Sequence, residues 1–310
     1  PLHQVTQSLV SESSHSFLDP KVLSRLSGLP IFARQPMLGA VSGRHRSPIK
    51  GSSLEFAQYR KYVPGDDTRR LDWKAWGRSD RFYIKEFEAD TNLRMCLIAD
   101  TSGSMNYGPK GNTKLDYTRR LAGTLAFLAA RQGDAVGLYA ASEKFTKEIP
   151  PKRSAAHLRV ILDELGSMEG GGDTGLVTAL HEGAEKIQQR ALVVIISDLF
   201  TEPAELKSAI QHLRFRKHDI AIFHLLEKHE VEFDFERPTR FVDLEGGSPV
   251  LVDPDIIGPQ YRKALALYLE EVTEIINDAA VDYHRVSVEE SYENVLARFL
   301  LNRAPKQAKG

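Results

Sequence analysis

The residues of this chain with the clearest chemical potential are the oxygen-bearing side chains of the hexapeptide DTSGSM at positions 100–105. An apolar run, LRMCLIA, ends directly before Asp100, and Ser102 and Ser104 follow at alternate positions. Three kinds of chemistry use such a group: a proteolytic aspartate, a nucleophilic serine, or a divalent metal ion held by oxygen atoms. The remaining sequence has to distinguish them.

Two other segments carry oxygen ligands at comparable places. Asp198 follows the strand-like run ALVVIIS, and Thr174 lies directly before a predicted helix in GGGDTGLVTAL. Ligands of open α/β sheets bind outside the carboxyl ends of the strands, so these segments should meet at one edge. Mg²⁺ prefers oxygen ligands, and two carboxylates nearly neutralise it, although Mn²⁺ or Ca²⁺ would suit the same oxygens. We therefore predict a Mg²⁺ site with the ligands Asp100, Ser102, Ser104, Thr174 and Asp198.

The two rival chemistries fit less well. An aspartic protease has glycine directly after the hydroxyl residue, whereas Ser102 follows Thr101 here. A serine hydrolase elbow reads G-x-S-x-G, but Ser102 lies between Asp100 and Ser104. The glycine run at 170–172 lacks the lysine of a phosphate-binding loop. A purely structural interpretation stays open, because Asp-Thr-Ser-Gly also forms turns and helix caps.

The elements that must position these residues alternate between strand and helix from residue 93 onward. This alternation predicts a doubly wound α/β fold with a mostly parallel sheet. An antiparallel excursion is expected at 229–255, and FTKEI at 145–149 could pair beside a neighbouring strand. The expected strands are 93–100, 134–141, 191–198 and 219–227, and the expected helices are 17–29, 113–131, 154–165, 175–189, 203–216, 259–280 and 290–302.

The D-x-S-x-S motif, together with Thr174 and Asp198, resembles the metal-ion-dependent adhesion site of von Willebrand A-type domains. The resemblance covers about residues 92–285. It implies that the two serines and the threonine bind the metal directly, and that the aspartates bind it directly or through water. It also implies that the ion accepts an acidic residue from a protein partner.

The stretch RKYVPGDDTRRLDW at 60–73 adds a second resemblance. With the preceding Glu55 and Phe56, it is similar to the bacterial domain-of-unknown-function family fifty-eight, whose pattern leads into a von Willebrand A-type domain. This resemblance implies an adaptor or partner of MoxR-type AAA+ ATPases, acting in the maturation of protein complexes. Charges of alternating sign beside tryptophan are typical of a salt-bridged turn or of a partner-binding surface. The candidate contact residues are Arg60, Asp66, Arg69, Asp72 and Trp73.

Composition and charge restrict the class of protein to which this chain can belong. The 310 residues carry a formal net charge of −1, which argues neither for nor against nucleic acid, and the single Cys96 excludes an internal disulfide. No apolar stretch is long enough to span a bilayer, so we expect a cytoplasmic protein. The expected parts are an arm with a short helix at 1–38, a β-rich segment at 39–91, the von Willebrand A-like domain at 92–285, and a C-terminal helix and tail at 286–310.

Three functions remain open at this stage. We favour a binding module that is not an enzyme and whose metal ion bridges to an acidic residue of a protein partner. A metal-dependent hydrolase would need a general base near the metal, and the sequence offers no compelling one: His181, about two turns into the helix after Thr174, is expected to be a surface or packing histidine. Residues 44–81 combine ten Lys/Arg and five Asp/Glu with aromatic residues, a pattern that could bind nucleic acid, but the mixed charge disfavours it.

Overall fold

The chain folds as two compact units, formed by Pro1–Arg34 with Leu93–Gly310 and by Gln35–Asn92. The computed structural model describes 15–34, 93–173 and 175–304, and the backbone of two strands in the second unit. Those strands, β1 (Glu55–Lys61) and β2 (Tyr83–Glu88), pair antiparallel. Arg60 therefore lies in a strand. The other residues predicted to contact a partner lie outside the described residues: Asp66, Arg69, Asp72 and Trp73.

A six-stranded sheet forms the centre of the larger unit, with the spatial order β10–β7–β6–β3–β4–β5. Neighbouring strands run parallel except for β4 and β5, which confirms the mostly parallel α/β fold. The chain moves outward from β3 to β5 and then returns to β6 on the other side of β3. Ligands bind at such a switch point, beyond the carboxyl ends of the strands. The strands are β3 (Arg94–Asp100), β4 (Ala135–Ala141), β5 (Phe145–Lys152), β6 (Leu192–Ser197), β7 (Asp219–Leu226) and β10 (Asp282–Ser287).

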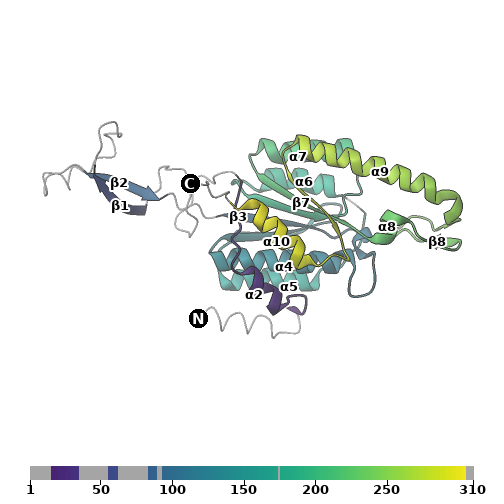
Figure 1. The fold of residues 1–310 in the computed structure, drawn as a ribbon, viewed down its shortest axis with the longest axis horizontal. Coiled ribbons are helices and arrows are strands. Elements are labelled where there is room, and N and C mark those ends of the chain that lie inside the picture. The colour runs from purple at the N-terminus through teal and green to yellow at the C-terminus, as the bar shows by residue number, and fades with distance from the viewer. Residues whose placement is uncertain (1–14, 35–54, 62–82, 89–92, 174, 305–310) are drawn as a thin grey trace. The chain divides into compact units, whose positions relative to one another are not determined.

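Helices cover both faces of this sheet (Figure 1). Strands β4, β6 and β7 are buried along their whole length, and β3 along all but its first residue, because both faces are covered. One layer contains α2 (Pro20–Leu26), α4 (Lys114–Gln132), α5 (Ala155–Ser167) and α10 (Tyr292–Arg303). The other contains α6 (Leu176–Lys186), α7 (Pro203–Phe215) and α9 (Pro254–Asp278).

The strand β10 was not expected from the sequence. Its residues, DYHRVS, are mostly polar, and the strand lies at one edge of the sheet. Within the strand only Asp282 and Val286 are buried, and Val288 is buried just after it. An edge strand does not need the continuous apolar run that identified β3 and β6. The domain boundary expected after residue 285 falls inside β10.

The region before β10 also differs in detail. Helix α9 begins at Pro254, five residues earlier than expected, because Asp253 accepts a hydrogen bond from the Asp255 N–H at 3.1 Å and Pro254 suits the first helical position. The segment 229–255 contains the expected antiparallel pair, β8 (Thr239–Phe241) with β9 (Val250–Val252). A short helix, α8 (Lys228–Glu232), precedes this strand pair.

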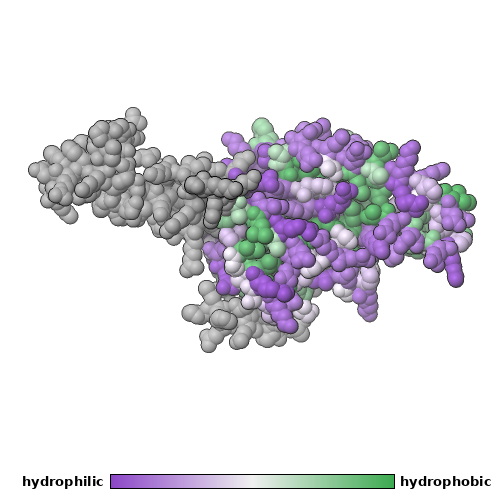
Figure 2. Space-filling view, in the orientation of Figure 1, coloured by the Kyte–Doolittle hydropathy of each residue, from purple (hydrophilic) through white to green (hydrophobic). Residues whose placement is uncertain are grey.

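Most of the surface visible in Figure 2 is hydrophilic, and exposed apolar residues gather at the end that carries β8 and β9. Leu251 and Ile256 are the most exposed of these, at 73% and 67%. No helix in the described part of the chain is long and apolar enough to cross a membrane.

The antiparallel strand β5 forms the other edge of the sheet and carries Pro150 and Pro151, neither of which has a backbone N–H. Gly137 of β4 lies directly against this segment. A Cβ atom at Gly137 would come within 2.7 Å of the Ile149 carbonyl oxygen and 2.8 Å of Pro151. Pro151 therefore packs on β4 at a place where only glycine fits.

A buried ionic cluster lies where β7 and β10 begin, at the amino edge of the sheet. The Arg303 guanidinium donates to both oxygens of Asp219, at 2.8 and 3.2 Å, and its Nε lies 2.7 Å from Asp282 Oδ2. It also donates to the Phe32 carbonyl at 2.8 Å, and the Arg34 backbone N–H donates to Asp219 at 2.8 Å. This cluster joins the segment after α2 and the end of α10 to the sheet.

Candidate metal centre

Asp100 ends β3 at the switch point and is almost fully buried. Its Oδ1 accepts a hydrogen bond from the Ser102 backbone N–H at 2.9 Å, and its Oδ2 accepts one from the Ser197 hydroxyl at 2.6 Å. The Ser102 and Ser104 hydroxyl oxygens are 3.0 Å apart at the start of a short 3₁₀ turn, Gly103–Asn106. The structure therefore brings Asp100, Ser102 and Ser104 together.

The glycine run at 170–172 closes over this turn. The Gly171 N–H donates to the Thr101 carbonyl at 2.9 Å, and the Gly103 N–H donates to the Gly172 carbonyl at 3.1 Å. Thr174 lies outside the described residues. Its neighbour Gly175 is held at the same edge, because its N–H donates to the Ser142 carbonyl at 3.0 Å.

Asp198 follows β6 at the same edge and is fully buried, but its carboxylate has a partner that the sequence did not suggest. The ammonium group of Lys114, from the first turn of α4, donates to Asp198 Oδ2 at 2.7 Å. It also donates to Glu230 Oε1 of α8 at 2.7 Å. Lys114 itself is fully buried, so Asp198 and Glu230 surround a positive charge inside the protein.

Burial and the neighbouring charges shift the pKa values of the ionisable groups in this cluster. Burial, and then the negative charge of Asp198, raise the pKa of Asp100 to about 6, against the hydrogen bonds from Ser197 and Ser102. Burial disfavours the charged form of Lys114, but Asp198 and Glu230 outweigh it and hold the Lys114 pKa above its usual value. Burial raises the pKa of Glu230, although the positive charge and the hydrogen bond of Lys114 act to lower it.

The carboxylates of this cluster outnumber its one ammonium group. With all groups ionised, the three carboxylates of Asp100, Asp198 and Glu230 and the one ammonium group of Lys114 sum to −2, which Mg²⁺ would balance. Within the described ranges, no group of three or more His, Cys, Asp or Glu is arranged to hold a metal. A metal at this edge would therefore depend on hydroxyl oxygens, such as those of Ser102 and Ser104, which add no charge.

Comparison with known proteins places the chain in a family. The family described as "Protein of unknown function DUF58" matches residues 58–268. The chain belongs to the DUF58 family. This confirms the family expected from the PGDD stretch and its flanking residues.

Similar proteins occur in Mycobacterium and in Bacteroides. Uncharacterized proteins of Mycobacterium tuberculosis and Mycobacterium bovis are each 24% identical to the DUF58 protein over 290 residues, covering 92% of this chain and 90% of theirs. Among solved structures, it is similar to the hypothetical protein BatB from Bacteroides thetaiotaomicron, with 16% identity, a TM-score of 0.46, and coverage of 69% of this chain and 99% of BatB. An aerotolerance-related membrane protein from Bacteroides fragilis gives 14% identity, a TM-score of 0.45, and coverage of 68% and 100%.

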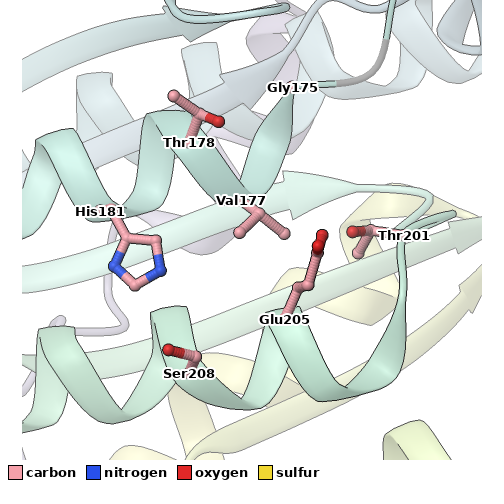
Figure 3. Close-up of a pocket in the computed structure, with 7 residues that line it drawn as sticks. All are labelled: Gly175, Val177, Thr178, His181, Thr201, Glu205 and Ser208. Carbon is pink, nitrogen blue, oxygen red and sulfur yellow. The ribbon is translucent and has the colours of Figure 1, made fainter.

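A groove of about 320 Å³ lies between α6 and α7 of the DUF58 protein. Gly175 and Thr201 form the end nearest the centre in sequence, since Thr201 follows Asp198 by three residues. Figure 3 shows the Val177 and Glu205 side chains extending toward one another across the groove, with His181 further along it. The remaining lining residues are Thr178 and Ser208.

His181, the base considered for a hydrolase, has a local partner instead of Asp100. Its Nδ1 lies 3.0 Å from His212 Nδ1 of α7, and His212 Nε2 lies 2.8 Å from a carboxylate oxygen of Glu185. The imidazole of His181 is thus part of the contact between α6 and α7.

Sequence reasoning missed Lys114, Ser197 and Glu230. One signal for Lys114 was present, because it falls on the same helical face as Leu121 and Leu125, seven and eleven residues later. A lysine on an apolar stripe implies a buried carboxylate partner. Glu230 carried no comparable signal, since it lies in a polar segment far along the chain.

The raised pKa of Asp100 leads to a test of stability against pH. The folded protein holds the Asp100 proton up to about pH 6, whereas the unfolded chain releases it near pH 4. The folded state binds more protons in this window, so stability falls as pH rises from about 4 to about 6. Asp100→Asn should raise the free energy of unfolding by about 3 kcal/mol at pH 7 and have little effect at pH 4. Urea denaturation in EDTA at both pH values measures this.

The exposed Asp173, from the loop beside the candidate centre, provides a matched control. Asp173→Asn should leave the stability unchanged at both pH values. Equal pH profiles for Asp100→Asn and the wild type would show that burial of the Asp100 charge costs nothing.

Proposed function

We propose that this DUF58 protein binds a divalent metal ion between the carboxyl ends of β3 and β6 and uses it to hold an acidic residue of a protein partner. The convergence of Asp100, Ser102 and Ser104 at the switch point of the sheet carries this proposal. Asp198, and Thr174 from the preceding loop, would complete the ligands. Mg²⁺ is the ion we favour, and it would supply a positive charge for a charge-assisted contact with the partner.

The groove between α6 and α7 supports a protein as the partner. A segment that offers its carboxylate at the metal could extend along this groove, past Thr201, Glu205 and Ser208, and form polar contacts there. From the family resemblance, we propose a MoxR-type AAA+ ATPase or one of its clients as the partner. Such a partner would place the protein in the cytoplasm.

Binding is favoured over the two alternative functions. His181 contacts His212 and not Asp100, which weakens the case for a metal-dependent hydrolase. Nucleic-acid binding was an alternative for residues 44–81 that their mixed charge disfavoured, and the structure describes only the backbone of β1 in this range. That alternative rests on sequence alone.

A metal titration combined with partner capture tests the proposal. Wild-type protein should bind Mn²⁺, detected by electron paramagnetic resonance, and Asp100→Ala should weaken this binding by about 100-fold, the upper end of the effects seen when metal sites lose a supporting group. A pull-down from the source cell lysate should then recover a protein with Mg²⁺ but not with EDTA, and not with Asp100→Ala.

Asp173→Ala is the control, since it removes an exposed carboxylate from the adjacent loop. Its Mn²⁺ affinity and its recovered proteins should match those of the wild type. A partner that Asp100→Ala retains in EDTA would contradict the metal bridge and direct attention to the Arg60–Trp73 segment.

A further inference from the structure

The loop between β8 and β9 lies directly on the serine turn of the candidate metal centre. A Cβ atom built on Gly103 would be 2.2 Å from the Leu244 carbonyl oxygen and 3.2 Å from Glu245 Cγ. The backbone of the loop therefore contacts the backbone between Ser102 and Ser104. Only glycine at position 103 allows this approach.

Glu245 is the residue of this loop that faces inward. Every other residue of 242–250 is exposed, whereas Glu245 is half-buried, and its side chain begins beside Gly103. The Glu245 backbone N–H donates to Asp243 Oδ1 at 2.8 Å, which fixes a tight turn. Gly246 follows with φ at +99°, a conformation that favours glycine.

Aromatic packing holds the loop in place. The Phe233 ring, at the end of α8, stacks on Phe241 of β8 with ring centroids 5.5 Å apart, and packs on Tyr261 of α9 at 4.5 Å. Helix α8 also carries Glu230, which pairs with Lys114. The β8–β9 loop is therefore tied to the same elements that surround the candidate centre.

We propose, on the basis of the proposed function, that Glu245 is an internal ligand of the metal ion. In the free protein its carboxylate takes the coordination position that a partner's acidic residue takes in the complex. Carboxylate oxygen is a preferred ligand of hard divalent cations. A carboxylate attached to the same chain is present at a high effective concentration, so a partner displaces it only when further contacts add to the binding.

The test compares Glu245→Gln with Asp243→Asn, which removes a charge from the same loop and keeps an oxygen that can accept the Glu245 N–H. The probe is Mn²⁺ alone. Glu245→Gln should weaken Mn²⁺ binding by about tenfold and add one metal-bound water, counted by water proton relaxation. Asp243→Asn should change neither value.

A second measurement on the unmodified chain uses a glutamate-specific protease. Cleavage after Glu245, identified by mass spectrometry, should slow when Mn²⁺ is added to the wild type. It should not slow in Asp100→Ala, because that variant lacks the ion.

The outcomes separate this inference from the proposed function. Mn²⁺ binding that is lost in Asp100→Ala but unchanged in affinity and water number by Glu245→Gln would overturn the internal ligand alone. Wild-type protein without any Asp100-dependent Mn²⁺ binding would overturn the proposed function and the internal ligand together.

Discussion

Lys114→Met is expected to lower the free energy of unfolding by about 3–5 kcal/mol in metal-free buffer, the usual cost of removing one partner from a buried ion pair. Methionine preserves the volume and the apolar stem, but leaves Asp198 and Glu230 buried without their counter-charge. Urea denaturation in EDTA measures the loss. Lys110→Met is the control, because Lys110 is exposed shortly before α4, and its replacement should cost well under 1 kcal/mol.

The same variant connects stability to the candidate metal. Without the ammonium group, the carboxylates of Asp100, Asp198 and Glu230 sum to −3, so Mg²⁺ should stabilise Lys114→Met more than it stabilises the wild type. A loss below about 1 kcal/mol in EDTA would mean that Asp198 and Glu230 are protonated or hydrated, and that the cluster is not held by Lys114.

Arg303→Met is expected to produce a loss of similar size, about 3–5 kcal/mol. Its guanidinium is fully buried and is shared between Asp219 and Asp282, and it also satisfies the Phe32 carbonyl. Removing it leaves Asp219 at the start of β7 without its guanidinium partner, and leaves Asp282 at the start of β10 paired only with the exposed Arg34 side chain. Thermal or urea unfolding followed by circular dichroism gives the difference.

Arg298→Met, on the same helix, is the matched control. Arg298 pairs with Glu290 on the surface, and exposed ion pairs contribute about 0–1 kcal/mol. Equal losses for Arg298→Met and Arg303→Met would show that the two sites are solvated alike, and would exclude a buried cluster at the amino edge.

The sequence predicted best the parts of the fold in which local pattern and burial agree. Strands β3 and β6 are short apolar runs because helices cover both faces, and the pattern indicated them directly. The edge strand β10 has no such run and was missed. The last long helix of the sheet domain was expected to begin at residue 259, yet α9 begins at Pro254 because the Asp253 cap and the first-turn proline set its start.

The residues of the candidate centre were likewise predicted best where they lie close together in the sequence. Asp100, Ser102 and Ser104 were identified because one turn contains all three. The pairing of Lys114 with Asp198 and Glu230 was not identified, because it joins segments 84 and 116 residues apart. Only the tertiary arrangement brings Glu230 of α8 to Lys114 and the β8–β9 loop to the serine turn.

The proline-bearing strand β5 affects how the protein can associate. An exposed sheet edge usually templates another strand through its free N–H and C=O groups, and proline removes the donors. With Pro150 and Pro151 in β5, this side of the sheet is a poor acceptor for an added strand. Addition of a strand from a second copy or from another protein is therefore disfavoured where the two prolines lie.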